Sequence, residues 1–519
     1  MVERIIKLSR RISLIALFGR LGLVYTDFRE SLRELFPFFL APQFRESINF
    51  EATGDHLFLP ESMSAKTLMR FETLSLLLCG GTLSGALVWI IIASTPFTIG
   101  TFFITVIAHL YALLVVFKLS VVAASPKGVF ERASREAIAA LSNEELPIYT
   151  VIVPLREEAA VMPQIVASLS AIDYPAEKLD LIITLEKYDH ETREAIYAAN
   201  APATWRIVTL PDTAPKTKPK ALNVAFKHIH GEHLVIYDAE IIPDRDQLKQ
   251  AVLAFRARPD IACFQTRLDH YNTDQSIMTK LFTTEFTFYY DIFLRGLAAL
   301  RLPIPLSGHS THFRTNALRA VGAWDPYNVA EDCDVGMRLY RAGYKSGMID
   351  SFSQEEATAT VDAWIRQRTR WMKGFIQTSI VQLRHPRTLM RELGGLSNFL
   401  AFLMLVPGMV FYCLLNVVTW IVFIAWVVSG SDAIKSLYPM PVLYLSTAAF
   451  VVGAIAFIFL NLLAVYRRGK ARLVRYWFLT PIYWMLLSFA AMRAVWQLAR
   501  TPHLWEKTAH GTHLAHPPQ

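Results

Sequence analysis

Long apolar stretches occur in two parts of this chain and constrain its fold more than any other feature. They gather near residues 71–124 and 394–498, and the sequence between them has the mixed composition of a water-soluble domain. A helix of about 20 apolar residues crosses about 30 Å of hydrocarbon. The segments of this kind are 71–94, 97–122, 399–428, 441–466 and 476–496. The sequence therefore predicts a multi-pass membrane protein with a soluble domain inserted between its membrane helices.

The charge pattern predicts on which side of the membrane each loop lies. The net charge is +8, and much of the Arg and Lys stands beside apolar spans, as in the strongly basic loop 467–475. The loop 429–436 carries little positive charge, so the positive-inside rule places it outside and loop 467–475 inside. The hairpin 71–122 then places the soluble domain inside as well. Cations beside spans favour anionic lipid as the partner and argue against nucleic acid.

Two apolar regions need a separate interpretation. Residues 1–24 mix cations with apolar residues but lack a cleavage site, which favours an amphipathic interfacial helix over a signal peptide. The last segment, 476–496, contains Pro481 and Arg493, so it either spans the membrane or is re-entrant. His109 lies inside a predicted span, where an imidazole bonded to the helix backbone is favoured over a functional site. The four cysteines are scattered and predict neither zinc nor disulfides.

The soluble part reads as an α/β domain. Apolar strands are predicted at 149–154, 179–185, 205–210 and 233–237, and helical spacing separates them. This alternation predicts a parallel sheet of Rossmann type, which binds ligands at the carboxyl ends of its strands. The predicted organisation is an N-terminal cytoplasmic or interfacial segment 1–70, a hairpin 71–124, the α/β domain 140–390, membrane segments 394–498 and a basic tail 499–519.

Polar residues follow these strands directly. Glu157 follows the first strand, Glu186 and Asp189 the second, and Asp238-Ala239-Glu240 the fourth. Two carboxylates spaced as in Asp-x-Glu suit a hard divalent cation that holds a diphosphate, although a solvated turn gives the same pattern. Lys220 stands in the first turn of a predicted helix, where a cation and free amides attract phosphate.

The second half of the domain adds an acidic run and a polar helix. Glu331 and Asp332 belong to the acidic run, and Gln367, Arg370 and Trp371 fall within one turn of a helix. An amide, a guanidinium and an indole on one face could line a groove for a diphosphate and a sugar. A basic interfacial helix anchored by Trp is the alternative. The aromatic stretch 281–300 is predicted to dock the domain on the membrane, with a helix beside the path of an acceptor as the alternative.

Taken together, these motifs resemble the membrane-embedded family 2 glycosyltransferases of the cellulose, hyaluronan and curdlan synthase type. The family signature is D, DxD, (T)ED and QxxRW, and this chain has Glu186, Asp238-x-Glu240, Ala330-Glu331-Asp332 and Gln367-x-x-Arg370-Trp371. The local sequence around Lys218-Pro219-Lys220 resembles that of alphaproteobacterial β-glucan synthase-like proteins. The resemblance implies a cytoplasmic GT-A domain between transmembrane segments of a bacterial inner membrane protein.

The resemblance also implies a role for each motif. Asp332 would be the catalytic base, and Asp238 and Glu240 would hold Mg²⁺ or Mn²⁺. The nucleotide-sugar would be bound by Glu157, Glu186, Asp189, Lys220 and Asp238. Gln367, Arg370 and Trp371 would bind the diphosphate and the acceptor. The implied reaction is inverting transfer from a UDP-sugar, UDP-glucose by similarity, to a growing polysaccharide that is exported.

Two other functions remain open at this point. A non-processive lipid glycosyltransferase, similar to the ceramide glucosyltransferases, shares most of the motifs. A catalytically silent membrane partner would keep the fold without the chemistry. A periplasmic accessory protein is a further possible partner. No cyclic di-GMP-binding module is recognisable, so any such regulation is assigned to the basic, His-rich tail 500–516.

Overall fold

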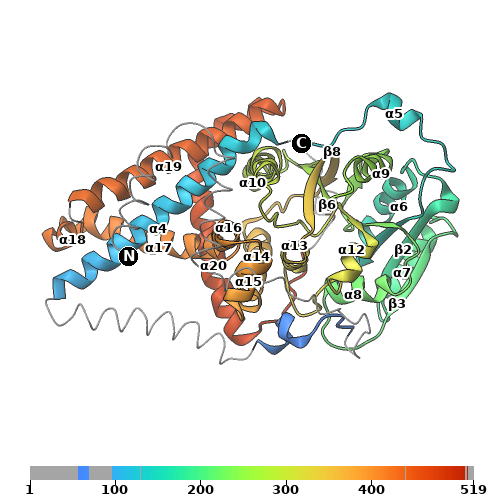
Figure 1. Ribbon diagram of the computed structural model, residues 1–519, viewed down its shortest axis with the longest axis horizontal. Coiled ribbons are helices and arrows are strands. Elements are labelled where there is room, and N and C mark those ends of the chain that lie inside the picture. Colours follow the sequence, from blue (N-terminus) through green and yellow to red (C-terminus); the bar gives the residue numbers. More distant parts are fainter. Residues whose placement is uncertain (1–55, 69–95, 129, 439, 509–510, 512–519) are drawn as a thin grey trace, which may run out of the picture. The chain divides into compact units, whose positions relative to one another are not determined.

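The computed structural model describes residues 56–68, 96–128, 130–438, 440–508 and 511, all within one compact unit that begins at Ile48. The predicted interfacial helix 1–24 and the predicted span 71–94 lie outside the described residues. Figure 1 shows the sheet and its helices on the right and long apolar helices on the left.

An eight-stranded sheet forms the centre of the α/β region, in the order β3-β2-β1-β4-β7-β6-β8-β5. Its strands are β1 (Tyr149–Leu155), β2 (Leu179–Glu186), β3 (Arg206–Leu210), β4 (His233–Ile236), β5 (Ile242–Pro243), β6 (Ile261–His270), β7 (Thr311–Arg314) and β8 (Lys345–Glu355). The four predicted strands are present, and their pairings are parallel. The central strands β1 and β4 are apolar and buried because helices cover both faces, whereas the edge strand β3 is partly exposed.

The parallel arrangement predicted from the first four strands does not extend through the second half of the sheet. Strand β7 runs antiparallel to both of its neighbours, β4 and β6, and β5 pairs antiparallel with β8. The sheet is therefore mixed. A four-residue strand such as β7 carries no sequence signal for its direction, which is decided by the path of the chain before it.

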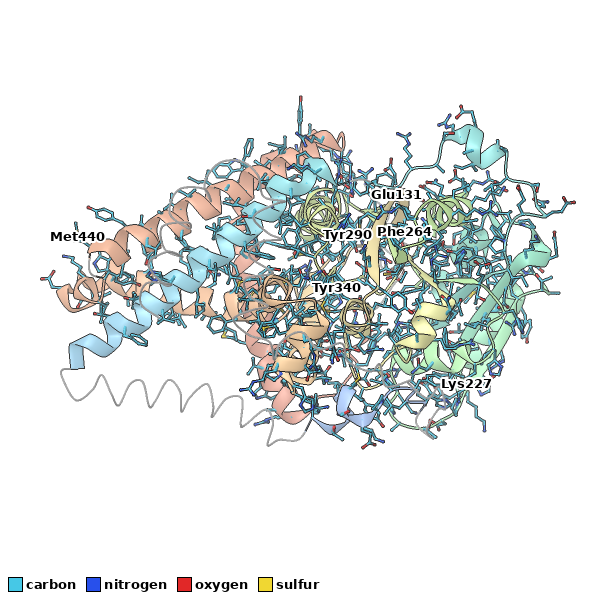
Figure 2. The ribbon with its side chains drawn as sticks, viewed as in Figure 1. Glu131, Lys227, Phe264, Tyr290, Tyr340 and Met440 are labelled. Atoms are coloured by element: carbon cyan, nitrogen blue, oxygen red, sulfur yellow. The ribbon has the colours of Figure 1, made fainter. Side chains whose placement is uncertain are left out.

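Helices surround this sheet and supply most of the polar site. They are α5 (Arg135–Ala139), α6 (Met162–Ser170), α7 (His190–Ala198), α8 (Lys218–Phe226), α9 (Gln247–Ala257), α10 (Ile277–Phe288), α11 (Leu294–Ala299), α12 (Thr315–Ala320), α13 (Glu331–Arg341), α14 (Val361–Gln382) and α15 (Pro386–Glu392). A π-helical turn, Tyr289–Phe293, joins α10 to α11. Phe264 of β6 and Tyr290 of this turn are buried, whereas Lys227 and Met440 are exposed (Figure 2).

Within the described part of the chain, four helices are long and apolar enough to cross a membrane. They correspond to α4 (Pro96–Ala124), α17 (Pro407–Ser429), α19 (Met440–Arg467) and α20 (Thr480–Arg500). The predicted span 399–428 is divided between α16 (Leu396–Leu405) and α17. Pro407 causes the division, because proline donates no backbone hydrogen bond and is tolerated in the first turn of a helix. The His109 Nδ1 atom donates to the carbonyl of Thr105 at 2.7 Å, as the structural interpretation of this residue predicts.

The basic loop after α19 contacts the α/β region directly. Arg468 forms ion pairs with Asp291, and Lys470 forms one with Asp269. Arg472 adds a more exposed pair with Asp274 at 2.5 Å. The loop therefore lies against the α/β region, and part of its positive charge is paired with carboxylates of that region.

Helix α20 packs against both α14 and α17 (Figure 1). The indole nitrogen of Trp364 in α14 donates to the hydroxyl of Tyr483 in α20 at 3.1 Å. The buried Lys373 Nζ donates to the side chain of Gln497 at 3.2 Å and to the carbonyl of Leu504 at 2.8 Å. These bonds fix the end of α20, and the segment after it, against the helix that carries the predicted Gln-x-x-Arg-Trp motif.

Candidate active site

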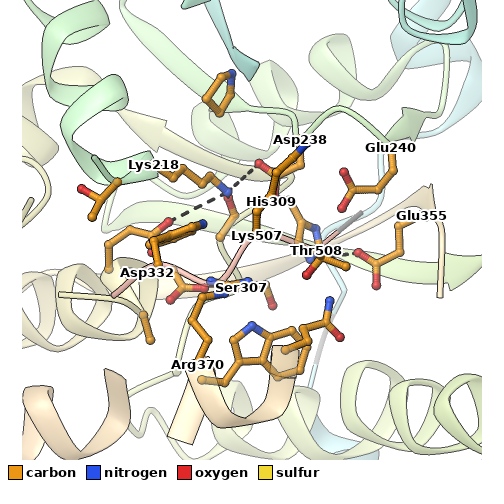
Figure 3. A pocket seen from close by; sticks show the side chains of 18 of the residues that line it. Lys218, Asp238, Glu240, Ser307, His309, Asp332, Glu355, Arg370, Lys507 and Thr508 are labelled. Carbon is orange, nitrogen blue, oxygen red and sulfur yellow. Dashed lines mark hydrogen bonds and ion pairs between the residues drawn. The ribbon is translucent and has the colours of Figure 1, made fainter. Parts of the chain in front are cut away.

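A cavity of about 240 Å³ lies at the carboxyl ends of β1, β2 and β4. The beginning of α13 and one face of α14 close its other side. Among its lining residues are Glu186, Asp238, Glu240, Asp332, Gln367, Arg370 and Trp371, all predicted from the sequence. The sheet edge, the acidic run and the polar helix therefore meet in one place (Figure 3).

Lys218 is the cation nearest to the strand-end carboxylate. Its Nζ lies 2.5 Å from Asp238 Oδ1, and it donates to the carbonyl of Gly308 at 2.7 Å. Burial lowers the pKa of Lys218, but Asp238 and Glu331 together outweigh this effect and raise the pKa above its ordinary value. Lys218 therefore stays charged in the cavity, where it can bind a diphosphate.

Two adjacent carboxyl groups begin α13. Glu331 is buried, and Asp332 faces the cavity with its Oδ1 accepting from the Cys333 backbone N–H at 2.7 Å. Burial raises the pKa of both carboxyl groups above their ordinary values. A carboxylate with a raised pKa is a stronger base, so Asp332 is suited to accept a proton from a hydroxyl group.

Helix α14 presents polar atoms that have no protein partner. Gln367 Oε1 and Arg370 Nε are buried and form no hydrogen bond with any described residue. Trp371 stacks on Phe286 with 6.1 Å between ring centroids, which leaves an aromatic wall beside these polar atoms. A side chain on Gly374 would overlap Ala330, so the close approach of α14 to the acidic run requires glycine there. The arrangement suits a ligand with a charged end and a ring-shaped apolar face.

The segment after α20 forms part of the cavity wall. Trp505, Lys507 and Thr508 all line it, and Trp505 stacks on Arg370 with 4.4 Å between the guanidinium carbon and the ring centroid. Glu506 is held by two hydrogen bonds of 2.6 Å from Arg493. The sequence predicted only a basic tail here, because nothing local to this segment indicates that it folds back onto the cavity.

Three predicted site residues have their contacts elsewhere. Lys220 Nζ donates to the carbonyls of Pro211 and Thr213, and Lys220 is not among the residues that line the cavity. Asp189 caps α7 by accepting from the Thr192 backbone at 3.1 Å, and it also accepts from the backbone of Glu157 at 2.5 Å. The side chain of Glu157 is exposed. Of the two acids weighed after the second strand, Glu186 faces the cavity, and burial raises its pKa.

Other cavity residues had no counterpart in the sequence prediction. Glu158, Lys218, His309 and Glu355 all line the cavity, and Lys507 Nζ lies 3.2 Å from Glu158. Lys218 stands within the segment Lys218-Pro219-Lys220 quoted for the family resemblance, but the sequence indicated no role for it. These side chains face the cavity because of the rotational position of the helix and the path of the loops. The residues of a motif do not specify either of these.

The donor set fits a hard divalent cation. Asp238 and Glu240 both line the cavity at the end of β4 (Figure 3). In the described part of the chain, no three His, Cys, Asp or Glu side chains are grouped so as to ligate one ion. Mg²⁺ is commonly held by one or two carboxylates, with substrate phosphates and water completing its shell. Asp238 and Glu240 are therefore the residues that would hold Mg²⁺ or Mn²⁺ together with a diphosphate.

Two curated proteins are similar to parts of this chain. Probable glycosyltransferase YdaM of Bacillus subtilis is 24% identical over 234 residues, which cover 44% of this chain and 56% of YdaM. The cellulose synthase 1 catalytic subunit (UDP-forming) of Komagataeibacter xylinus is 26% identical over 353 residues, covering 66% of this chain and 45% of that protein. The chain thus spans about half the length of the curated relatives it matches.

A solved structure and a family comparison complete these findings. The mannosyltransferase PcManGT from Pyrobaculum calidifontis, solved with GDP-Man and Mn²⁺, is 18% identical with a TM-score of 0.44, covering 75% of this chain and 98% of that one. The family model described as glycosyl transferase family group 2 matches residues 233–496, about half of the chain. This chain belongs to glycosyl transferase family group 2.

Proposed function

We propose that this protein is a processive, inverting glycosyltransferase of a bacterial inner membrane that polymerises a β-glucan from UDP-glucose and exports it. One observation carries the proposal: a base, two cations and a pair of strand-end carboxylates line the same cavity as an aromatic wall. The base is Asp332, the cations are Lys218 and Arg370, and the carboxylates are Asp238 and Glu240. The cellulose synthase relative supports a β-linked polymer as the product. We also propose that the protein is related to the alphaproteobacterial β-glucan synthase-like proteins.

The cavity residues divide the reaction between them. Asp332 takes the proton from an acceptor hydroxyl, whose oxygen attacks the anomeric carbon as the bond to the diphosphate breaks on the opposite face. This single displacement converts an α-linked donor into a β-linked product. Lys218 and Arg370 stabilise the negative charge that develops on the leaving diphosphate. A divalent cation, when bound to Asp238 and Glu240, would neutralise further charge on the same group.

The apolar wall of the cavity suits a polymeric acceptor. Phe286, Trp371 and Phe375 line it together with Met409, which belongs to the membrane helix α17. Aromatic faces stack on the apolar faces of sugar rings. A growing chain can therefore remain bound beside the membrane helices between transfers, which is what processive synthesis requires.

Membrane vesicles with the α/β region facing outward provide the direct test. They would receive radiolabelled UDP-glucose with Mg²⁺, Mn²⁺ or EDTA, and the products would be sized before and after β-glucanase treatment. We expect a large product that β-glucanase degrades, and that is lost with EDTA or Asp332→Asn. Label confined to a single-sugar lipid would instead establish the lipid transferase. If UDP-glucose gives no product, GDP-mannose and UDP-N-acetylglucosamine are tested next, and failure of all donors would support the catalytically silent partner.

The same vesicles test orientation and regulation. We propose that the α/β region and loop 467–475 face the cytoplasm, so a cysteine at Arg472 should be labelled from the cytoplasmic side and one at Ser431 from the outside. The opposite labelling pattern would overturn this orientation. If the tail binds cyclic di-GMP, deletion of residues 512–519 should abolish any activation by that nucleotide. Higher synthesis with periplasmic extract would support an accessory protein.

A further inference from the structure

One imidazole in the cavity has no part in the proposed mechanism. His309 lines the cavity, and its side chain is only 13% exposed. It follows Gly308, where an added Cβ would lie 3.1 Å from Asp332 Oδ2 and 3.3 Å from Lys218 Nζ. The loop that carries His309 therefore runs directly against the proposed catalytic base (Figure 3).

A chain of side chains orients this ring. His309 Nε2 lies 3.3 Å from Glu355 Oε2, and the other carboxylate oxygen, Oε1, lies 3.0 Å from His270 Nε2. His270 is itself buried, with its Nδ1 atom 3.1 Å from the hydroxyl of Thr283. A carboxylate can only accept a hydrogen bond, so it favours the His309 tautomer that carries its proton on Nε2. In that tautomer Nδ1 is an acceptor.

The Nδ1 atom of His309 is buried and forms no hydrogen bond with any described residue. Leaving a buried polar atom unpaired is unfavourable, and a ligand that donates a hydrogen bond removes this cost. The diphosphate of a nucleotide-sugar has only acceptor oxygens, whereas each sugar hydroxyl can donate. Beside the catalytic base, the group that fits Nδ1 is therefore a hydroxyl of the sugar.

We propose that His309 is a specificity-determining residue that accepts a hydrogen bond through Nδ1 from one hydroxyl of the transferred hexose. Glu355 acts as a positioning residue that holds the required tautomer. This inference rests on the proposed function, because it assigns a residue to the donor sugar of the same site. The donor's nucleotide and diphosphate groups are not contacted by His309 in this arrangement.

Binding measurements on the purified full-length protein separate the sugar from the rest of the donor. Dissociation constants for UDP-glucose and for UDP would be measured by calorimetry on the wild type, His309→Ala, His309→Asn and His309→Gln. The oxygen of Asn reaches the position of Nδ1, whereas the polar end of Gln reaches that of Nε2. We expect His309→Ala to raise the dissociation constant of UDP-glucose about threefold to tenfold, which is the effect of losing one hydrogen bond. The dissociation constant of UDP should not change. His309→Asn should restore most of the affinity and His309→Gln should not.

Deoxyglucose donors would identify the hydroxyl. The donor that lacks the contacted hydroxyl should bind the wild type more weakly and should lose nothing further with His309→Ala. Equal weakening of UDP and UDP-glucose, or no weakening of either, would overturn the proposal. If the wild type binds another nucleotide-sugar in place of UDP-glucose, the proposed donor is wrong, and the same comparison is made with that donor and its nucleoside diphosphate. Melting temperatures exclude a general loss of folding.

Discussion

The guanidinium of Arg370 and the indole of Trp505 stack at 4.4 Å in the wall of the active-site cavity. Arg370 belongs to α14, and Trp505 lies in the segment that follows α20. The contact exists because Lys373 and Gln377 of α14 donate hydrogen bonds to backbone carbonyls of that segment, at Leu504 and Pro502. The proposed diphosphate-binding arginine is therefore positioned by the C-terminal segment.

Replacing Trp505 with Ala should weaken donor binding. Loss of the cation–π contact frees the Arg370 side chain, so we expect KM for the donor to rise about threefold to tenfold. Trp496 is a matched control, because Arg500 stacks on it at 4.8 Å but Trp496 is 55% exposed and does not line the cavity. Trp496→Ala should leave KM unchanged. Equal effects of the two substitutions would show that the contact has no specific role at the site.

Lys218 and Lys220 form a second matched pair. Lys218→Met removes the cation beside Asp238, so the kcat of the folded protein should fall on the order of 100-fold. Lys220→Met removes two hydrogen bonds to backbone carbonyls from a buried site and should lower stability by about 1–3 kcal/mol, with activity retained by the folded protein. Initial rates and melting temperatures measure both effects. The reverse result would return the diphosphate-binding role to Lys220.

Substitutions at Glu186 and Asp189 should likewise have different effects, one on donor binding and the other on stability. Glu186→Gln changes a cavity residue, so we expect KM for the donor to rise several-fold without a fall in melting temperature. Asp189→Ala removes the N-cap of α7 and should cost about 1 kcal/mol of stability without changing KM. Donor titrations and thermal unfolding of the two variants decide the question. A raised KM for Asp189→Ala alone would identify Asp189 as the ligand instead.

The raised pKa of Asp332 predicts opposite effects on activity and stability. Catalysis needs the ionised form, so activity should fall as the pH drops through this raised pKa. Folding favours the protonated form, whose stabilising effect is complete below the ordinary pKa of about 4 and is lost as pH rises through the raised value. Asp332→Asn stays neutral, so it should be inactive yet more stable than the wild type at pH 7.

Thermal unfolding of both proteins across pH 4 to 8 checks the stability effect. The difference in melting temperature should be largest at neutral pH and should shrink toward pH 4, as Asp332 becomes protonated in the folded state and then in the unfolded state. A constant difference at every pH would mean that the charge of Asp332 is not its cause. Rate measurements on the wild type over the same pH range would show at which pH its activity falls as the solution becomes more acidic.

The sequence predicted most elements because their signals are local. The apolar strands β1 to β4 appear where alternation with helices placed them, and the apolar helices α4, α17, α19 and α20 occupy predicted spans. The errors concern features that depend on distant contacts. The direction of β7 is set by its pairing with β4 and β6, and the division between α16 and α17 depends on how the chain turns at Pro407.

By itself the sequence determined the long apolar helices, the α/β domain between them and the family motifs, because periodicity and motif residues depend only on neighbouring positions in the chain. Only the tertiary structure decided which side chains share the cavity. Helix phase turns Lys218 inward and Lys220 toward the Pro211 and Thr213 carbonyls. Packing of α20 on α14 brings Trp505 to Arg370. These choices depend on contacts between residues far apart in the chain, and such contacts leave no local pattern in a single sequence.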